Sequence, residues 1–380
     1  MNTNQIQRFA TQARNILLAG VNAKLNLLGF NADGSDNNVT PPSRYSDSTV
    51  FQGRVIPGTR FYEQWMELYN RIKLIGFDDV CEEAAYTWFN RLVALRILQK
   101  NGIIQPVIEY DNPAVKVPRI VNDARRGKYD FLMPSDRQQL NEVIDDDTRL
   151  FEQFQVLITA YCHNHPILKA CFGGITGYTE LLLPNNILVD GNFIDLLNNT
   201  DYLTDDDYRQ SELIGWLYQF YISEKKDEVF ASFKDGNKAE ADQIPAATQI
   251  FTPNWIVKYM VQNTAGRIYL DNHPNSPLKD SWKYLVDSPA ESPERATPSQ
   301  PEVSTPGTAP VDSTKCEAFN EVKARKHEST SPSERGCPTG GGVLKLSSLE
   351  SYTFADLSCG SGHILGEAFD LLYALYRQEF

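Results

Sequence analysis

The stretch CEEAAYTWFNRLVALRILQKNG, residues 81–102, repeats apolar side chains at intervals of three and four positions. Trp88, Phe89, Leu92 and Leu95 therefore share one face of a helix. A stripe of this kind is far more often buried core than the lining of a ligand site. The sequence thus predicts a long amphipathic helix against which other helices pack.

The same periodicity recurs on both sides of this stretch, so the first part of the chain is expected to be mainly α-helical. Gly, Asn, Asp, Ser and Pro dominate residues 31–48, which predicts a loop. An acidic turn, Asp205 to Asp207, suits the start of a helix. The further helices are expected in residues 8–30, 61–77, 150–162, 178–199 and 208–233.

Composition and charge limit the classes of function. The chain has 380 residues, 41% of them hydrophobic, which is ordinary globular composition with room for about two domains. Its 49 acidic and 36 basic residues give a net charge of −13, which argues against nucleic-acid binding through bulk positive charge. The best local candidate for phosphate contact is a basic cluster, although a solvated loop is the favoured interpretation; it comprises Lys116, Arg119, Arg125, Arg126 and Lys128.

Cysteine usage and hydropathy indicate the compartment. No apolar run reaches the length of a membrane span and the first residues do not form a signal peptide, so a cytoplasmic protein without membrane contact is expected. The six cysteines contain no CxxC pair and are expected to be free thiols. Cys162, His163, His165 and Cys171 match no zinc spacing, so a structural role is favoured and no metal site is predicted.

Two segments differ from this helical pattern and contain candidate functional motifs. The first, residues 248–263, contains Phe251-Thr252-Pro253, in which Thr252 is expected to cap a helix that begins at Asn254 or just before. The second, residues 352–376, is expected to form a strand over 352–356, a Gly-rich turn and a helix over 364–376. Either segment alone has a plain structural interpretation, as a capped helix or as a tight turn.

Composition changes sharply between these two segments. Residues 288–342 hold eight of the 21 prolines, many Ser, Thr and Glu residues and few large apolar side chains. Such a stretch buries too little surface to offset its ordering entropy, so a disordered insertion is predicted.

Taken together, the two segments resemble motifs X and I of amino-methyltransferases that use S-adenosylmethionine. Their order, X before I, resembles the gamma class of N6-adenine DNA methyltransferases. The strings at residues 87–98, 214–230, 248–267 and 356–376 are similar to the PglX family, the adenine-specific methyltransferases of bacteriophage-exclusion (BREX) systems. The resemblance does not extend to residues 288–342, and motif I departs at Leu357 and Ser358.

The resemblance implies the fold and its organisation. It implies a mainly α N-terminal helical domain followed by the start of an α/β Rossmann-like class I methyltransferase domain. A helical domain is expected in residues 1–240, the motif X segment and its helix in 241–287, and the insertion in 288–342. Residues 343–380 would hold the first strand, Gly-rich loop and helix of a truncated methyltransferase domain.

The resemblance also implies a site for S-adenosylmethionine. It assigns cofactor contacts to Phe251, Thr252 and Pro253 on one side and to Asp356, Cys359, Gly360 and Gly362 on the other. Asp356 would accept a hydrogen bond from the ammonium group, Phe251 would supply an aromatic wall near the sulfonium, and the glycines would permit close backbone approach.

No catalytic residue is assigned, because the Asn-Pro-Pro-aromatic motif that grips adenine is absent and the only Pro-Pro is Pro41-Pro42. The chain is therefore expected to be the N-terminal portion of a larger enzyme and inactive alone, with DNA bound through the complete enzyme and other BREX proteins as further partners. The alternative is a non-catalytic helical interaction module of a defence complex. A nucleotide-dependent dehydrogenase is disfavoured, because Leu365 stands where its third glycine is required.

Overall fold

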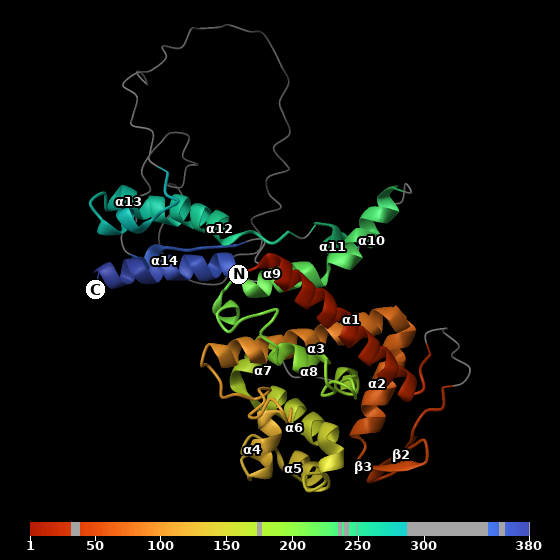
Figure 1. Cartoon of the computed structure of the whole chain (residues 1–380). Coiled ribbons are helices and arrows are strands. Elements are labelled where there is room, and N and C mark those ends of the chain that lie inside the picture. Colours follow the sequence, from red (N-terminus) through yellow and green to blue (C-terminus); the bar gives the residue numbers. More distant parts are fainter. Residues whose placement is uncertain are drawn as a thin grey trace, which may run out of the picture. The chain divides into compact units, whose positions relative to one another are not determined.

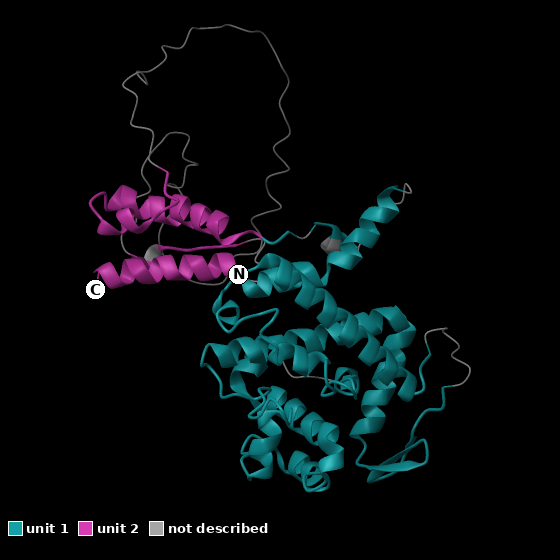
Figure 2. Cartoon of the chain, in the orientation of Figure 1, with its two compact units in different colours: residues 1–251 teal, residues 252–380 magenta. Residues whose placement is uncertain are grey.

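A computed structural model gives the fold of the chain. The structure describes residues 1–31, 39–172, 177–234, 238, 243–248, 250–286, 349–356 and 362–379. These residues form two compact units, residues 1–251 (unit 1) and 252–380 (unit 2), which Figure 2 colours separately. The predicted insertion at 288–342 lies outside the described residues.

Unit 1 is mainly α-helical (Figure 1), as the periodicity predicts. Its α-helices are α1 (Thr3–Leu27), α2 (Arg60–Ile75), α3 (Phe77–Lys100), α4 (Arg119–Arg125), α5 (Pro134–Asn141), α6 (Leu150–Asn164), α7 (Pro166–Phe172), α8 (Phe193–Asn198), α9 (Leu213–Tyr221), α10 (Ser223–Lys234) and α11 (Ile244–Thr248). Short 3-10 helices accompany them in the described residues: η2 (Asp147–Arg149), η3 (Gly177–Glu180) and η4 (Asp207–Arg209).

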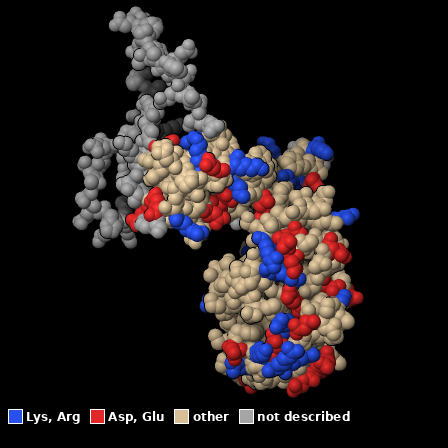
Figure 3. Space-filling model, turned by 60° about the vertical axis from the view of Figure 1, so that its left-hand side comes forward, with Lys and Arg blue, Asp and Glu red and all other residues tan. Residues whose placement is uncertain are grey.

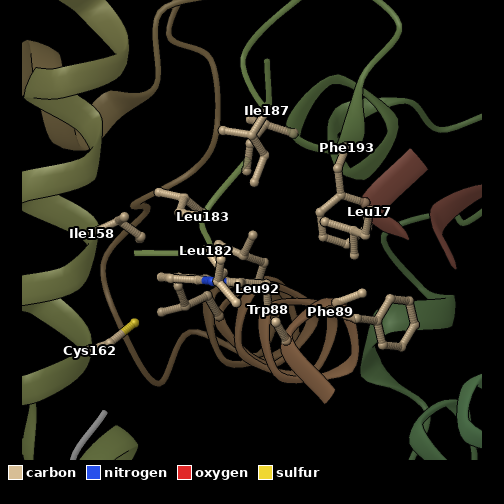
Figure 4. Packing of buried hydrophobic residues seen from close by; sticks show 14 of the residues in the cluster. Leu17, Trp88, Phe89, Leu92, Ile158, Cys162, Leu182, Leu183, Ile187 and Phe193 are labelled. Atoms are coloured by element: carbon tan, nitrogen blue, oxygen red, sulfur yellow. The ribbon is translucent and has the colours of Figure 1, made fainter. Parts of the chain in front are cut away.

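The core of unit 1 is built around α3. Helices α1 and α2 pack directly on α3, and α8 and α9 pack on α1. Trp88, Phe89 and Leu92 of α3 are almost wholly buried, and Figure 4 shows them beside side chains from α6 and from residues 182–193. The indole Nε1 of Trp88 donates a hydrogen bond of 2.9 Å to the carbonyl oxygen of Thr179. The stretch from which the helix was predicted is therefore the centre of the unit.

Two of the predicted helices are interrupted. Residues 178–199 form η3, a series of turns and the short α8, because Pro184 and the positive-φ Gly191 prevent a continuous helix. Residues 208–233 divide into α9 and α10 at Ile222, whose ψ of 2° ends the first helix. In both segments the apolar spacing is helical, but local backbone geometry sets the boundaries.

A small antiparallel sheet was not predicted. Its strands are β1 (Ser43–Arg44), β2 (Ser48–Phe51) and β3 (Arg54–Pro57), in the order β1-β2-β3. The β2–β3 hairpin pairs Phe51 with Arg54, and both turn residues, Gln52 and Gly53, have positive φ. This is the two-residue turn that suits the twist of a hairpin.

The described residues of unit 2 form helical segments and one extended segment. Its elements are α12 (Asn254–Val261), the π-helix η5 (Gln262–Gly266), α13 (Arg267–Asn272), the 3-10 helices η6 (Pro277–Ser281) and η10 (Leu349–Ser351), and α14 (His363–Glu379). Buried residues of α12, α13 and α14, among them Val257, Tyr269 and Leu375, form its own small core. The helix predicted over 364–376 is thus confirmed. In the residues described, no helix combines the length and apolar content needed to cross a membrane.

The strand predicted over residues 352–356 is not formed. The segment is without regular secondary structure, although its burial alternates from half-buried Tyr352 to exposed Thr353 and onward to Asp356. A strand requires a neighbour for its backbone hydrogen bonds, and the described residues of unit 2 contain no other strand. The Rossmann-like start of the fold therefore remains a prediction, whereas the helical part is observed.

Gln153, a fully buried residue of α6, provides one test of this fold. Its Nε2 donates to the carbonyl oxygens of Val143 and Asp146, both at 2.7 Å, and its Oε1 accepts from Arg125 at 2.8 Å. Gln153→Met is expected to lower the free energy of unfolding by about 2–4 kcal/mol, because buried carbonyls lose their donor. Urea denaturation measures this loss. The exposed Gln138→Met on α5 is the control and should change stability by less than about 0.5 kcal/mol; equal effects would contradict the assigned role.

The buried carboxylate of Glu180 provides a second test. Burial alone would raise the pKa of Glu180, but hydrogen bonds from His163 and Gln64 and the charge of Arg60 hold it below its ordinary value. The ionised form therefore stabilises the fold above about pH 4.5, and that contribution is lost as the pH falls through the lowered pKa.

Glu180→Gln should accordingly cost about 2 kcal/mol at neutral pH, since it removes the charge of a buried carboxylate that accepts charge-assisted hydrogen bonds, one of them from the half-exposed Arg60. The difference from wild type should shrink in acid, where Glu180 is protonated. Urea denaturation across the pH range measures both effects, with the exposed Glu142→Gln as the control. A difference that stays constant down to low pH would disprove this interpretation.

Candidate cofactor-binding site

The turn at Thr252-Pro253 leads into α12. Pro253, with ψ of 146°, is the N-cap residue, and its carbonyl accepts from the backbone N–H groups of Ile256 and Val257. The predicted start of the helix at Asn254 is confirmed. The prediction that Thr252 caps it is wrong, because the non-helical ψ of Pro253 places Thr252 one residue outside the helix. Thr252 contributes its carbonyl oxygen instead.

Phe251 belongs to unit 1. Only 7% of it is exposed, its ring centroid lies 4.9 Å from that of Trp216 on α9, and its backbone N–H donates to Oε1 of Gln219 at 2.7 Å. A Cβ atom at Gly215 would lie 1.9 Å from the Phe251 ring, so only glycine leaves room there. The role of Phe251 as a wall for the cofactor stays a prediction.

The Gly-rich turn of motif I is described only at its two ends. Asp356 ends the extended segment, and Gly362, with φ of +76°, immediately precedes α14. A side chain at this φ is strained, so glycine is required here by the backbone itself. Cys359 and Gly360, which were predicted to contact the cofactor, lie outside the described residues.

A hydrogen bond connects the two motifs within unit 2. The ring Nε2 of His363 lies 2.8 Å from the carbonyl oxygen of Thr252, 111 positions away in the sequence, and donates its proton to that oxygen. Helix α12 also packs on α14. His363 is the first residue of α14 and was not among the predicted site residues. Its place directly after the motif I glycines was the one available signal.

A cavity of about 520 Å³ lies beside this connection. It is lined by α12, η5 and α13 on one side and by the extended segment and α14 on the other: Met260, Thr264, Ala265, Ile268, residues 352–356, Ile364 and Leu372. Among these described lining residues Asp356 alone carries a charge. Apolar walls with one ionised group and a volume of a few hundred Å³ are typical of small-molecule sites.

The π-helix η5 shapes one wall of the cavity and was not predicted. Its residues Gln262 and Asn263 anchor the segment that follows η6, because the Gln262 side chain accepts from the backbone of Tyr284 at 2.9 Å and the Asn263 side chain bonds Tyr284 and Val286. Single-turn π-helices are rare and occur frequently at functional sites. No periodicity in the sequence signals this local widening of the helix.

The residues of this site fit the predicted cofactor in kind. Asp356 offers a carboxylate to an ammonium group, and the backbone at Gly362 can approach a ligand without a Cβ clash. Thr264 and Thr353 supply hydroxyl groups among the apolar lining residues. S-adenosylmethionine is an amino acid joined to an aromatic base. Its hydrogen-bonding groups can pair with this carboxylate and these hydroxyl groups.

The other candidate ligands do not assemble into a metal site. His163 bonds Glu180, and the ring of His165 lies 5.0 Å from that of Tyr161. Cys162 is buried whereas Cys171 is exposed. In the described part of the chain, no three His, Cys, Asp or Glu side chains are grouped so as to hold a metal ion.

Comparison with known proteins identifies relatives of this chain. No protein-family model matches the chain. It is 33% identical to adenine-specific methyltransferase BrxX of Escherichia coli O9:H4 (strain HS) over all 380 residues, which is 28% of the relative. It is 29% identical to adenine-specific methyltransferase PglX of Lacticaseibacillus casei (strain Zhang) over 408 aligned positions, which cover all of this chain and 30% of the relative.

The chain thus spans less than a third of the length of these curated relatives. The similarity covers both units, including the turn at Thr252 and the loop before α14. It therefore supports the resemblance on which the cofactor site was predicted. Over its whole length the chain is a BREX PglX-like protein, related to the adenine-specific methyltransferases BrxX and PglX.

Proposed function

We propose that this chain is part of a DNA N6-adenine methyltransferase that uses S-adenosylmethionine and acts in BREX-type phage defence. The full-length similarity to two adenine-specific methyltransferases supports the reaction class. The observation that carries the proposal is the hydrogen bond between His363 and Thr252, because it holds together two turns that the sequence links to one cofactor.

In this proposal unit 2 binds the methionine end of the cofactor. Asp356 accepts a hydrogen bond from the ammonium group, and Cys359, Gly360 and Gly362 are the further proposed contacts. Thr252 and Pro253 form the facing turn, which His363 fixes in place. When bound, S-adenosylmethionine supplies the methyl group that is transferred. The residues of this chain bind and orient it.

The target adenine requires residues that these 380 positions do not contain. An adenine must be flipped out of the duplex before its amino group can react. The Asn-Pro-Pro-aromatic motif expected to hold that group is absent from the sequence. We therefore propose that the chain binds cofactor but does not methylate DNA by itself.

Exposed aromatic side chains support a second candidate, a non-catalytic helical interaction module of a defence complex. Trp255 and Tyr259 are exposed on α12, and Phe369 and Tyr373 are exposed on α14, where their rings stack at 6.3 Å. Aromatic residues on a protein surface are enriched at interfaces with other proteins. This candidate requires no cofactor, so cofactor binding separates the two.

Calorimetric titration with S-adenosylmethionine tests the first proposal. Saturable binding to the wild-type chain is expected. Asp356→Asn should weaken it by about 10- to 150-fold, because a hydrogen bond to a charged group contributes about 1.5–3 kcal/mol.

The matched control is Asp370→Asn on α14, an exposed carboxylate outside the cavity lining, which should bind like wild type. Absence of binding to the wild-type chain would refute the cofactor site and favour the interaction module. Equal affinities of the two variants would show that Asp356 is not a cofactor contact.

A pair of glycine variants tests the role of the motif I turn. Gly362→Ala should weaken cofactor binding and cost about 1–2 kcal/mol in stability, because its φ of +76° is unfavourable for a side chain. Gly366→Ala lies inside α14 with open space around it, so it should raise stability by about 0.5–1 kcal/mol and leave affinity unchanged. Thermal unfolding and calorimetry on both variants measure this contrast, and a similar loss of affinity in both would count against a specific role for the turn.

A further inference from the structure

The basic cluster singled out in the sequence separates into three groups. Lys116 forms an ion pair with Asp195 of α8 at 2.9 Å. Arg125 turns towards Gln153 and Asp147, both within 2.9 Å. The remaining three cations, Arg119, Arg126 and Lys128, gather around one carboxylate, that of Asp123. We call these three residues and Asp123 the α4 cation cluster.

The α4 cation cluster carries more positive than negative charge. The cations lie 3.6, 3.8 and 4.0 Å from the Asp123 carboxylate, and their side chains are 42%, 63% and 71% exposed. Asp111 adds one further carboxylate, 3.7 Å from Arg119. A net positive charge is therefore presented to solvent in a chain whose overall charge is −13.

None of the three cations is close enough to Asp123 for a hydrogen bond. Donor–acceptor distances in such bonds are about 2.7–3.2 Å, whereas these contacts are longer. The buried Oδ1 of Asp123 has no hydrogen-bond donor. The carboxylate thus gathers the cations by charge while their N–H groups remain available to an acceptor from outside.

Backbone geometry fixes the arrangement. Arg126 is the C-cap of α4, and Gly127 follows with φ of +78°. The backbone N–H of Gly127 donates to Ala124 and that of Lys128 donates to Asp123, both at 2.9 Å. This is the Schellman arrangement, which returns the chain over the end of the helix. It places Lys128 beside Arg126, next to the same carboxylate.

Stability of α4 does not account for all three cations. Arg126 and Lys128 lie at the C-terminal end of the helix, where its dipole favours positive charge. Arg119 is the first helical residue, where the dipole disfavours it. Its pairing with Asp123 four residues later also has the less favourable orientation, basic before acidic. Its two nearest carboxylates, Asp111 at 3.7 Å and Asp123 at 3.6 Å, are both too distant for a hydrogen bond.

We propose that the α4 cation cluster contacts the phosphate backbone of duplex DNA. Guanidinium and ammonium groups with unfilled donors are the usual partners of phosphate oxygens, and such contacts position a protein on DNA without reading bases. Beside the cluster, Arg137 lies over the ring of Tyr129 at 5.8 Å and adds another exposed cation. On the face drawn in Figure 3, Lys and Arg gather in patches interleaved with acidic residues.

The proposal rests on the proposed function in its choice of DNA as the polyanion. Its test is the binding of the 380-residue chain to a fluorescent duplex of about 20 base pairs, measured by anisotropy between about 50 and 200 mM salt. The test variant is Arg126→Gln/Lys128→Gln. The control is Arg8→Gln/Arg54→Gln, which removes the same charge from exposed positions on α1 and β3.

The test variant should raise the apparent Kd at the lowest salt by at least about tenfold and reduce the log–log salt slope by about two, one for each lost phosphate contact. The control should bind within about twofold of wild type. Absence of duplex binding by the wild type, or equal weakening in both double variants, would overturn the proposal. The second result would mean that only net charge matters.

Arg119→Gln adds a readout that a purely structural role would not give. It should weaken DNA binding while leaving the melting temperature of the chain unchanged or raised, because it removes a cation from the unfavourable end of α4. A lower melting temperature with unchanged DNA binding would contradict the proposal. Titration of each variant with S-adenosylmethionine keeps the two proposals apart, since loss of DNA binding with intact cofactor binding concerns this surface alone.

Discussion

Burial of α3 is the constraint on which unit 1 depends. Helix α3 places Trp88, Phe89 and Leu92 in the interior, so neighbouring helices must cover it on several sides. The indole N–H of Trp88 cannot remain unpaired there, and it finds the carbonyl of Thr179, close to the buried carboxylate of Glu180. The apolar core and the polar network of Arg60, Gln64 and His163 therefore support each other.

Unit 2 is stabilised differently from unit 1. Its small core leaves Trp255, Tyr259, Phe369 and Tyr373 exposed, and its extended segment has no strand beside it among the described residues. What holds it together is helix packing and the hydrogen bond from His363 to Thr252. That bond brings Thr252, just before α12, next to His363, the first residue of α14.

Two kinds of charged side chain in unit 1 can be distinguished, those in close ion pairs and those of the proposed DNA contact. Several cations of unit 1 form close ion pairs with carboxylates, as Arg96 does with Glu109 at 2.6 Å. Such pairs hold segments together and leave little capacity for a polyanion. The α4 cation cluster differs because three cations share Asp123 at distances too long for hydrogen bonds. An acidic protein can therefore still present phosphate-binding groups, provided that they are local.

The sequence by itself determined the helices around Trp88, the start of α12 at Asn254 and the course of α14, because apolar spacing is a local property that packing then uses directly. Only the tertiary structure decided that residues 352–356 lack a strand, that Thr252 acts through its carbonyl rather than as a cap, and that the basic cluster divides into three groups. Each depends on partners distant in the sequence: a neighbouring strand, the His363 ring and the carboxylates of other helices. A one-dimensional pattern cannot specify which of several possible partners a polar group meets.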